Sequence, residues 1–285
     1  MILNKSLIHY KEVLEQPLLP LTWDVAPLIS RGDRVVVFGE FASMKSWIML
    51  HLALHLGAGS KWLETFDIPE VRRVLYVDEE MNERTLRRRV KRLGIGAGVE
   101  VAPGLAFLSR VGVRFDAYGA GMLLSYLHEQ KFAPQVVIVE ALRRVLVGDE
   151  NEARDLAQFW RNLEPISRQG ITVIITHHMN KPPQAGKRAT RHRASGSTDI
   201  LAGSDASFAV ERVSGEVARM TGIKARDDVE LAPFLVRLDD RGDRTGPITL
   251  TPAKGSETTE SPQGAVLGPE ALAALKQEVF QQKCE

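Results

Sequence analysis

The chain has 285 residues and a single cysteine, Cys284, next to its C-terminus. One thiol cannot form an internal disulfide, so the fold does not depend on cross-links, which fits a reducing compartment. No apolar run approaches the roughly 20 residues that a membrane-spanning helix needs, and residues 1–16 lack the long apolar core of a signal peptide. We therefore expect a soluble, cytoplasmic protein without a membrane partner.

An excess of charge of one sign is also absent. The 37 Lys and Arg residues nearly balance the 36 Asp and Glu residues, which leaves a net charge of +1. Any surface that binds nucleic acid must therefore be local. Hydrophobic residues make up 44% and charged residues 26% of the chain, as in ordinary globular proteins. The length suits one sizeable α/β domain with extensions, or two small domains.

Residues 34–56 form the most informative stretch. A β-branched run at 34–38 predicts a buried parallel strand, residues 39–45 a tight loop, and Ser46 the start of a helix. The loop nearly matches the phosphate-binding pattern G-x-x-x-x-G-K-[ST], because Met44 replaces its second glycine. Lys45 would reach the terminal phosphates of a nucleotide and the Ser46 hydroxyl would ligate Mg²⁺. The expected nucleotide-binding residues are Gly39, Glu40, Phe41, Ala42, Ser43, Met44, Lys45, Ser46 and Trp47.

Acidic residues follow a second predicted strand at 73–78. Ligands of open α/β sheets lie at the carboxyl ends of the strands, so Glu80 could be a general base that orients and deprotonates water. Alternatively, Asp78, Glu79 and Glu80 could cap the basic helix predicted at 83–93, since acids favour a helix N-terminus. The residue pattern alone leaves both interpretations open.

Two later strands also end in polar residues. The strand at 135–140 ends in Glu140, as a Walker B strand ends in a carboxylate that holds the Mg²⁺ water shell, although Asp is usual there. The longer side chain would place the carboxylate about 1.5 Å further out. The strand at 170–176 precedes His177 and His178, which are placed to sense a γ-phosphate. A metal site is the weaker alternative, because no further ligand has a convincing spacing.

Residues 179–198 read as a loop that contains six basic or histidine side chains and no acid. Such a loop beside a nucleotide site could contact the phosphates of a nucleic acid, and a solvated surface loop is the alternative. The expected DNA-binding residues are Lys187, Arg188, Arg191 and Arg193.

Further strands are predicted at 207–212, 217–225, 234–239 and 247–250. The sequence then becomes rich in Gly, Pro, Ser and Thr, which predicts a flexible linker. Residues 269–283 predict an amphipathic helix that docks onto the chain itself or onto a partner.

Taken together, these motifs resemble the RecA-like P-loop ATPases of the RepA/DnaB hexameric helicase superfamily, in particular small single-domain RepA-like ATPases of plasmids and phages. The resemblance covers residues 17–240. The matching segments are GEFASMKS at 39–46, LYVDEEM at 75–81, VVIVE at 136–140, GDENEARD at 148–155, ITVIITHHMNK at 171–181, RASGS at 193–197 and KAR at 224–226.

The resemblance implies an α/β fold with a mostly parallel central sheet flanked by helices and an antiparallel C-terminal extension. It divides the chain into an N-terminal helix and lead-in segment (1–33), the ATPase domain (34–250), and a linker with a C-terminal helix (251–285). It also implies ATP and Mg²⁺ as cofactors, a homo-hexamer, and single-stranded DNA as a partner.

Site roles follow from the same resemblance. Glu80 matches the catalytic glutamate and His178 the γ-phosphate sensor. Lys224 and Arg226 match fingers that reach the nucleotide of a neighbouring subunit. Ser46 and Glu140 match the metal site. The implied function is a helicase or translocase in the replication of a mobile element. Two alternatives stay open: a nucleotide-binding regulatory or assembly protein with little hydrolysis, and a recombination mediator that forms filaments.

Overall fold

The structure is a computed structural model, and it describes residues 8–17, 20–178, 199–226, 231–240, 242 and 245–254. Within these ranges no helix is both long and apolar enough to cross a bilayer. The predicted DNA-binding residues Lys187, Arg188, Arg191 and Arg193 lie outside the described residues, and so does the helix predicted at 269–283.

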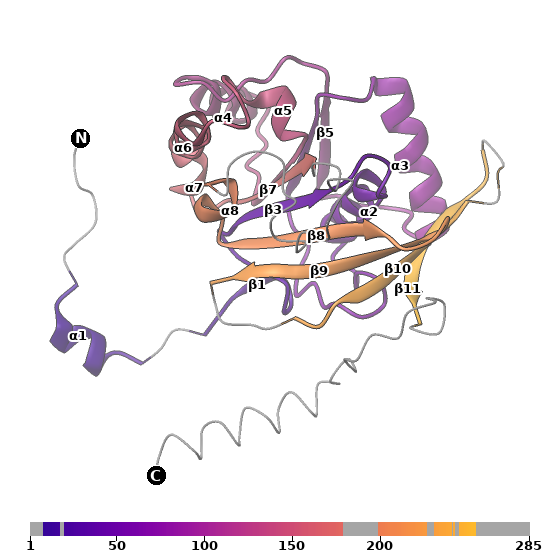
Figure 1. Cartoon of the computed structure of the whole chain (residues 1–285), viewed down its shortest axis with the longest axis horizontal. Coiled ribbons are helices and arrows are strands. Elements are labelled where there is room, and N and C mark those ends of the chain that lie inside the picture. The colour runs from indigo at the N-terminus through magenta and orange to yellow at the C-terminus, as the bar shows by residue number, and fades with distance from the viewer. Residues whose placement is uncertain are drawn as a thin grey trace, which may run out of the picture.

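A nine-stranded sheet forms the centre of the molecule (Figure 1). Its strand order is β11-β10-β9-β8-β3-β7-β6-β4-β5, in which the six strands from β8 to β5 are parallel and β9, β10 and β11 are antiparallel additions. This confirms the predicted fold class. The strands are β3 (Arg34–Gly39), β4 (Val74–Asp78), β5 (Leu105–Ser109), β6 (Val136–Glu140), β7 (Thr172–His178), β8 (Ala206–Arg212), β9 (Val217–Ala225), β10 (Phe234–Asp240) and β11 (Ile248–Ala253).

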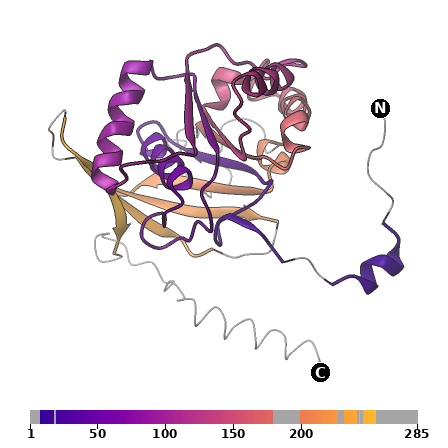
Figure 2. The ribbon, with the colours of Figure 1, turned by 180° about the vertical axis from the view of Figure 1, so that it is seen from behind.

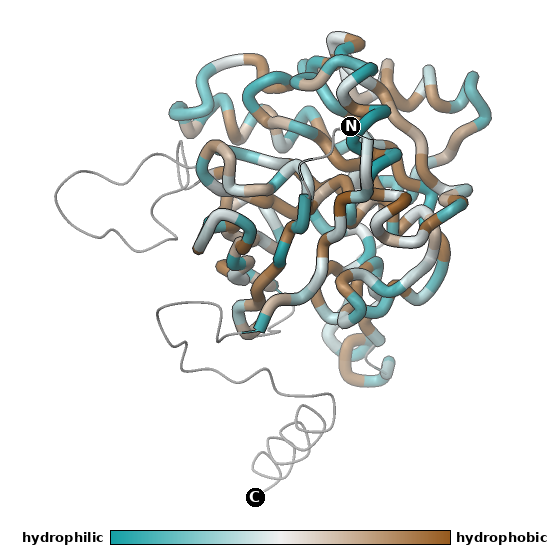
Figure 3. The backbone as a smooth tube through the Cα atoms, turned by 90° about the vertical axis from the view of Figure 1, so that its right-hand side faces the viewer, coloured by the Kyte–Doolittle hydropathy of each residue, from teal (hydrophilic) through white to brown (hydrophobic). Residues whose placement is uncertain are grey.

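The central strands are apolar throughout because helices cover both faces of the sheet. Successive side chains of a strand point to opposite faces. Accordingly, Val35 and Val37 belong to one hydrophobic cluster, and Val36 and Phe38 belong to another. In Figure 3, brown hydrophobic stretches run through the middle of the fold, and teal hydrophilic stretches are frequent at its outside. Burial on both faces explains why these strands read as continuous apolar runs in the sequence.

The helices form two layers (Figures 1 and 2). On one face, α2 (Lys45–Ala58) and α3 (Glu83–Ala97) contribute to the first cluster. On the other face, the second cluster receives residues of five shorter helices, which are α4 (Gly119–Glu129), α5 (Leu142–Val145), α6 (Ala153–Asn162), α7 (Glu164–Ser167) and α8 (Asp199–Gly203).

The antiparallel strands curl back onto α3. The Arg92 guanidinium pairs with the Asp240 carboxylate at 2.6 Å and donates to the Gly246 carbonyl at 2.7 Å. A Cβ on Gly96 would lie 2.0 Å from the carbonyl oxygen of Ile248, so only glycine permits this approach of α3 to β11. The extension therefore packs on α3, and it ends at Ala253, three residues beyond the predicted strand end.

The lead-in segment forms a hairpin of β1 (Trp23–Val25) and β2 (Ile29–Ser30), which the sequence analysis did not predict. Asp24 anchors it, because this buried carboxylate pairs with Arg72 at 2.6 Å and accepts a hydrogen bond from Thr172. Before the hairpin, α1 (Tyr10–Glu15) buries none of its residues and stands away from the sheet (Figures 1 and 2).

Candidate nucleotide-binding site

The loop between β3 and α2 has the backbone shape of an anion-binding nest. Ala42 and Met44 both adopt the left-handed conformation, with φ of 59° and 75°. Such alternation turns successive N–H groups toward one point, where the positive end of the α2 dipole adds to the attraction for phosphate. At Gly39, a Cβ would lie 2.3 Å from the Val210 carbonyl oxygen, so this glycine is needed for close packing against β8. Met44 thus adopts the backbone conformation that a glycine would otherwise supply.

Lys45 and Ser46 begin α2, one residue earlier than predicted. The Lys45 ammonium is buried against its own loop, where it donates to the carbonyl groups of Gly39 at 2.7 Å and Glu40 at 2.9 Å, and to the Ser43 hydroxyl at 3.3 Å. Burial lowers the pKa of Lys45 to about 8, and the negative charge of Glu140 is the largest opposing influence. A phosphate anion in the nest would give this ammonium a charged partner in place of neutral oxygens.

Glu140 and Ser46, the predicted metal ligands, meet at the edge of the sheet. The Ser46 hydroxyl donates to Glu140 Oε1 at 2.6 Å and the Tyr76 hydroxyl donates to Oε2 at 3.2 Å. Burial raises the pKa of Glu140, so a cation beside this carboxylate would stabilise its charged form. A hydroxyl and a carboxylate are hard oxygen donors of the kind that Mg²⁺ prefers, and the two residues therefore fit that ion.

The three consecutive acids at the end of β4 have three different positions. Asp78 Oδ1 accepts hydrogen bonds from the N–H groups of Glu80 at 2.9 Å and Met81 at 2.7 Å, which fixes the turn. Glu79 accepts hydrogen bonds from the N–H groups of Gly112 and Val113. None of the three caps α3, whose N-cap is Asn82, with its side chain accepting from Thr85 N–H at 2.9 Å.

Glu80 is the acid that faces the loop. Its Oε1 lies 3.7 Å from His178 Nε2 and 3.9 Å from Arg144 Nε. These contacts, of which His178 is the strongest, lower the pKa of Glu80 against the effect of burial. A carboxylate that stays ionised can accept a proton, as a general base must. His177 and His178 end β7 and so point to opposite faces, and His177 lies 3.9 Å from Glu150 instead.

Several site residues were not predicted. Arg110, just after β5, donates from Nε to the Glu80 carbonyl at 2.8 Å. Arg212, at the end of β8, donates to the Ala42 carbonyl of the loop at 3.1 Å. Arg144, which lies 3.9 Å from Glu80, was not predicted either. Arg110 and Arg212 lie at the carboxyl ends of strands, where polar residues are a signal that could have identified them. Arg144 lies in α5, which follows β6.

The remaining predicted nucleotide-binding residues lie in the loop itself or at the start of α2. Ser43 is buried, whereas Phe41 is 87% exposed. The Trp47 ring carries the Arg89 guanidinium at 4.5 Å from its centre, a cation–π contact that couples α2 to α3.

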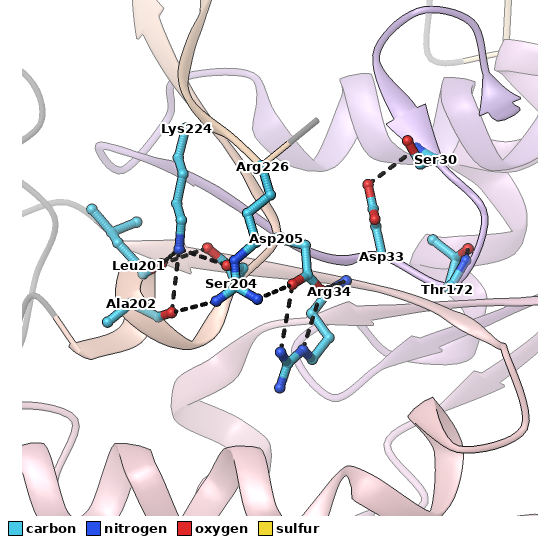
Figure 4. A network of polar contacts seen from close by, with 11 residues as sticks. Ser30, Asp33, Arg34, Thr172, Leu201, Ala202, Ser204, Asp205, Lys224 and Arg226 are labelled. Atoms are coloured by element: carbon cyan, nitrogen blue, oxygen red, sulfur yellow. Dashed lines mark hydrogen bonds and ion pairs between the residues drawn. The ribbon is translucent and has the colours of Figure 1, made fainter. Parts of the chain in front are cut away.

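Lys224 and Arg226 lie at the opposite end of the sheet from the loop. Lys224 is paired with Ser207 at the start of β8, and Gly39 is paired with Val210 towards its end. Both cations contact residues near α8 (Figure 4). The structure therefore brings together Lys45, Ser46, Glu80, Glu140 and His178, and it keeps Lys224 and Arg226 apart from them within one chain.

Comparisons with known proteins agree with this fold. A family model described as an AAA domain matches residues 10–184, which is more than half of the chain. Among solved structures, a DnaB-like replicative helicase, described with its interactions with primase, has a TM-score of 0.53 at 14% identity. That match covers 74% of this chain and 57% of the helicase chain. The RadB recombinase has a TM-score of 0.52 at 16% identity, over 79% of this chain and 92% of its own. No curated protein sequence matches the chain.

The fold is RecA-like, as in the DnaB-like helicase and the RadB recombinase, and the loop between β3 and α2 is of the P-loop type. Within that class, the chain belongs to the AAA domain family whose model it matches.

Proposed function

We propose that the chain is a Mg²⁺-dependent ATPase that acts on DNA as a RepA-like hexameric ring, as a helicase or translocase in the replication of a mobile element. The observation that carries this proposal is the convergence of Lys45, Ser46, Glu80, Glu140 and His178 from four strand ends onto one loop. Family membership and the likeness to a DnaB-like helicase support it. A cytoplasmic location is part of the proposal.

In this proposal the loop N–H groups and Lys45 bind the phosphates of ATP. Ser46 and Glu140 would hold Mg²⁺, which when bound neutralises charge on the phosphate oxygens. Glu80 orients water and takes its proton, and the Asp78 turn and Arg110 hold Glu80 in place. His178 contacts Glu80 and precedes residues 179–198, so it is placed to relate nucleotide state to that segment.

Lys224 and Arg226 act on the nucleotide of a neighbouring copy. A cyclic, head-to-tail assembly is what such a contact requires. The proposed hexamer follows the RepA/DnaB resemblance, and closed rings on single-stranded DNA seen by negative-stain imaging would support it. Filaments instead would favour the recombination-mediator alternative, to which the RadB likeness in fold corresponds.

The decisive test is steady-state ATP hydrolysis with and without single-stranded DNA, for the wild type, Lys45→Ala and Glu80→Gln. We expect DNA-stimulated turnover in the wild type. It should fall by at least about 100-fold in Glu80→Gln, since general base catalysis typically contributes 10²–10⁴-fold. Asp67→Asn is the matched control, because this exposed carboxylate pairs with Lys61, its one ion partner among the residues that the structure describes, and its residue packs against Ala26 of the lead-in segment. Tight ATP binding without turnover in the wild type would contradict the proposed motor activity. It would favour the regulatory alternative, in which Glu140 stays hydrogen-bonded to Ser46.

DNA binding is proposed to depend on Lys187, Arg188, Arg191 and Arg193. Replacing all four by Ala should reduce the slope of log K against log salt by roughly 3, because each phosphate that a cation neutralises on a single strand adds about 0.7 to the slope. Fluorescence anisotropy of a labelled oligonucleotide at several salt concentrations measures this slope. An unchanged slope would place the DNA-binding surface elsewhere on the chain.

A further inference from the structure

Arg226, the proposed finger, is held by partners in its own chain. Its Nη1 lies 2.9 Å from Asp205 Oδ1, and its Nη2 donates to the Ala202 carbonyl at 3.2 Å (Figure 4). The Arg226 side chain is 52% exposed, whereas that of Asp205 is 19% exposed. A guanidinium has five N–H donors in a planar fork, so these two contacts leave donors with which the exposed group can meet an anion.

Asp205 is itself fixed on several sides. Its Oδ2 accepts hydrogen bonds from Arg34 N–H at 2.9 Å and Arg34 Nε at 3.2 Å (Figure 4). Its backbone N–H donates to the Arg34 carbonyl at 2.7 Å, and its carbonyl accepts from Arg226 N–H at 3.1 Å. The Arg34 guanidinium lies 5.7 Å from the centre of the Trp160 ring. The Asp205 carboxylate therefore has little freedom to turn.

Lys224 is held by the end of α8. Its ammonium donates to the carbonyl groups of Leu201 and Ser204, both at 2.6 Å, and of Ala202 at 3.2 Å. This turn packs on Trp160 through Gly203, where an added Cβ would lie 2.2 Å from the indole ring. The same ring thus supports both Arg34 and the α8 turn.

We propose that Asp205 is a positioning residue for the Arg226 finger: through its bonds to Arg34 it holds the guanidinium in the direction in which the finger meets the phosphates of a neighbouring copy. This inference rests on the proposed trans-acting role of Arg226. A finger oriented in advance loses less conformational entropy when it engages, and a misplacement of 1 Å can reduce turnover by 10²-fold. Asp205 touches no nucleotide and acts only through Arg226.

Subunit mixing isolates this role. A donor subunit carries Lys45→Ala and so supplies an intact finger without turnover in its own site. An acceptor subunit carries Arg226→Ala and so supplies an intact loop without a finger. Each alone should be inactive, and a mixture of the two should recover DNA-stimulated hydrolysis at the interfaces between donor finger and acceptor loop.

Asp205→Asn is then added to one subunit at a time. In the donor, we expect kcat of the mixture to fall by about 10- to 100-fold with KM for ATP unchanged. In the acceptor, where no finger remains to be positioned, we expect no change. Asp67→Asn in the donor is the matched control and should have no effect. Arg34→Lys in the donor is a second variant, which keeps a charge but loses the planar fork, and it should give a smaller loss with the same donor-only pattern.

The outcomes are distinct. Equal losses from both placements would mean that Asp205 only supports folding, and the positioning role would be overturned. No loss from either placement would overturn it as well. Full activity of Arg226→Ala alone, or no recovery in the donor–acceptor mixture, would instead refute the trans-acting finger and the inference together.

Discussion

Replacing Met44 by glycine tests whether this residue impairs the nucleotide loop or stabilises it. Met44 has φ 75° and ψ 3° as the N-cap of α2, and a residue with a Cβ pays about 1–2 kcal/mol for this left-handed conformation. Its side chain, however, is only 7% exposed and belongs to the hydrophobic cluster around α2. Removing a buried Met side chain typically costs about 2–5 kcal/mol.

Burial outweighs strain in this comparison. Glycine also gains about 0.5–1 kcal/mol of conformational freedom in the unfolded chain. Met44→Gly should therefore lower the free energy of unfolding by about 0.5–5 kcal/mol, which corresponds to a fall in Tm of roughly 1–10 °C for a domain of this size. The affinity for ATP should stay within about threefold of the wild type, because the backbone already has the conformation that glycine would adopt.

Urea unfolding followed by tryptophan fluorescence measures the first quantity, and titration with a fluorescent ATP analogue measures the second. Ala42→Gly is the matched control. Ala42 has φ 59° but is exposed, so this change relieves strain without removing buried surface. It should leave stability unchanged or raise it by up to about 1 kcal/mol. A Met44→Gly protein as stable as the wild type would refute the balance argued above, and a tenfold gain in ATP affinity would show that the Met44 side chain obstructs the loop.

Two further predictions concern buried polar groups. Burial lowers the pKa of His51 to about 3. The unfolded chain therefore binds more protons than the folded chain between about pH 3 and 6.5, and stability falls as the pH drops through this window, by at most about 1.4 kcal/mol per pH unit for this one group. His51→Leu should flatten the dependence of the urea midpoint on pH over pH 6.5–4.5, and an unchanged slope would contradict the assignment. Asp24→Ala should lower the free energy of unfolding, measured in urea, by about 3 kcal/mol, because it leaves Arg72 buried without its main partner. The loss should lie at the lower end of the usual range because Glu70 still pairs with Arg72. The exposed Asp67→Asn control should cost at most about 0.5 kcal/mol, and an equal effect of the two changes would refute the anchoring role of Asp24.

The strands and the loop of the site were predictable because local signals determine them. Continuous β-branched runs indicate strands buried on both faces, and parallel strands place their carboxyl ends along one edge. That rule alone brings Gly39, Asp78, Glu140 and His178 together, and the register agrees, with Gly39 beside His178 and Asp78 beside Glu140. The short helices α5 and α8 carry no such signal, since four or five residues are too few to show a period.

The position of the acids at 78–80 between a strand and a helix does not by itself separate their roles. Each acid lies at the end of a strand and before a helix, so the cap and the base were equally consistent with position. The structure distinguishes the two interpretations, because Asn82 is the N-cap residue of α3 and the acids contact other groups. Asn is a preferred N-cap residue, and the Asn82–Thr85 spacing was a usable signal.

The placement of Lys224 and Arg226 depends on strand register, which no local pattern reveals. Along β8, Val210, the partner of Gly39, lies three positions after Ser207, the partner of Lys224. At about 3.3 Å per residue this is roughly 10 Å of strand before the loop even begins, and both side chains are directed to α8 and Asp205 at the far end. An arginine fixed there by Asp205 does not reach its own Lys45. If Arg226 takes part in hydrolysis, the working site is therefore built from two copies of the chain, and hydrolysis should fall steeply when the protein is diluted below the concentration at which those copies associate.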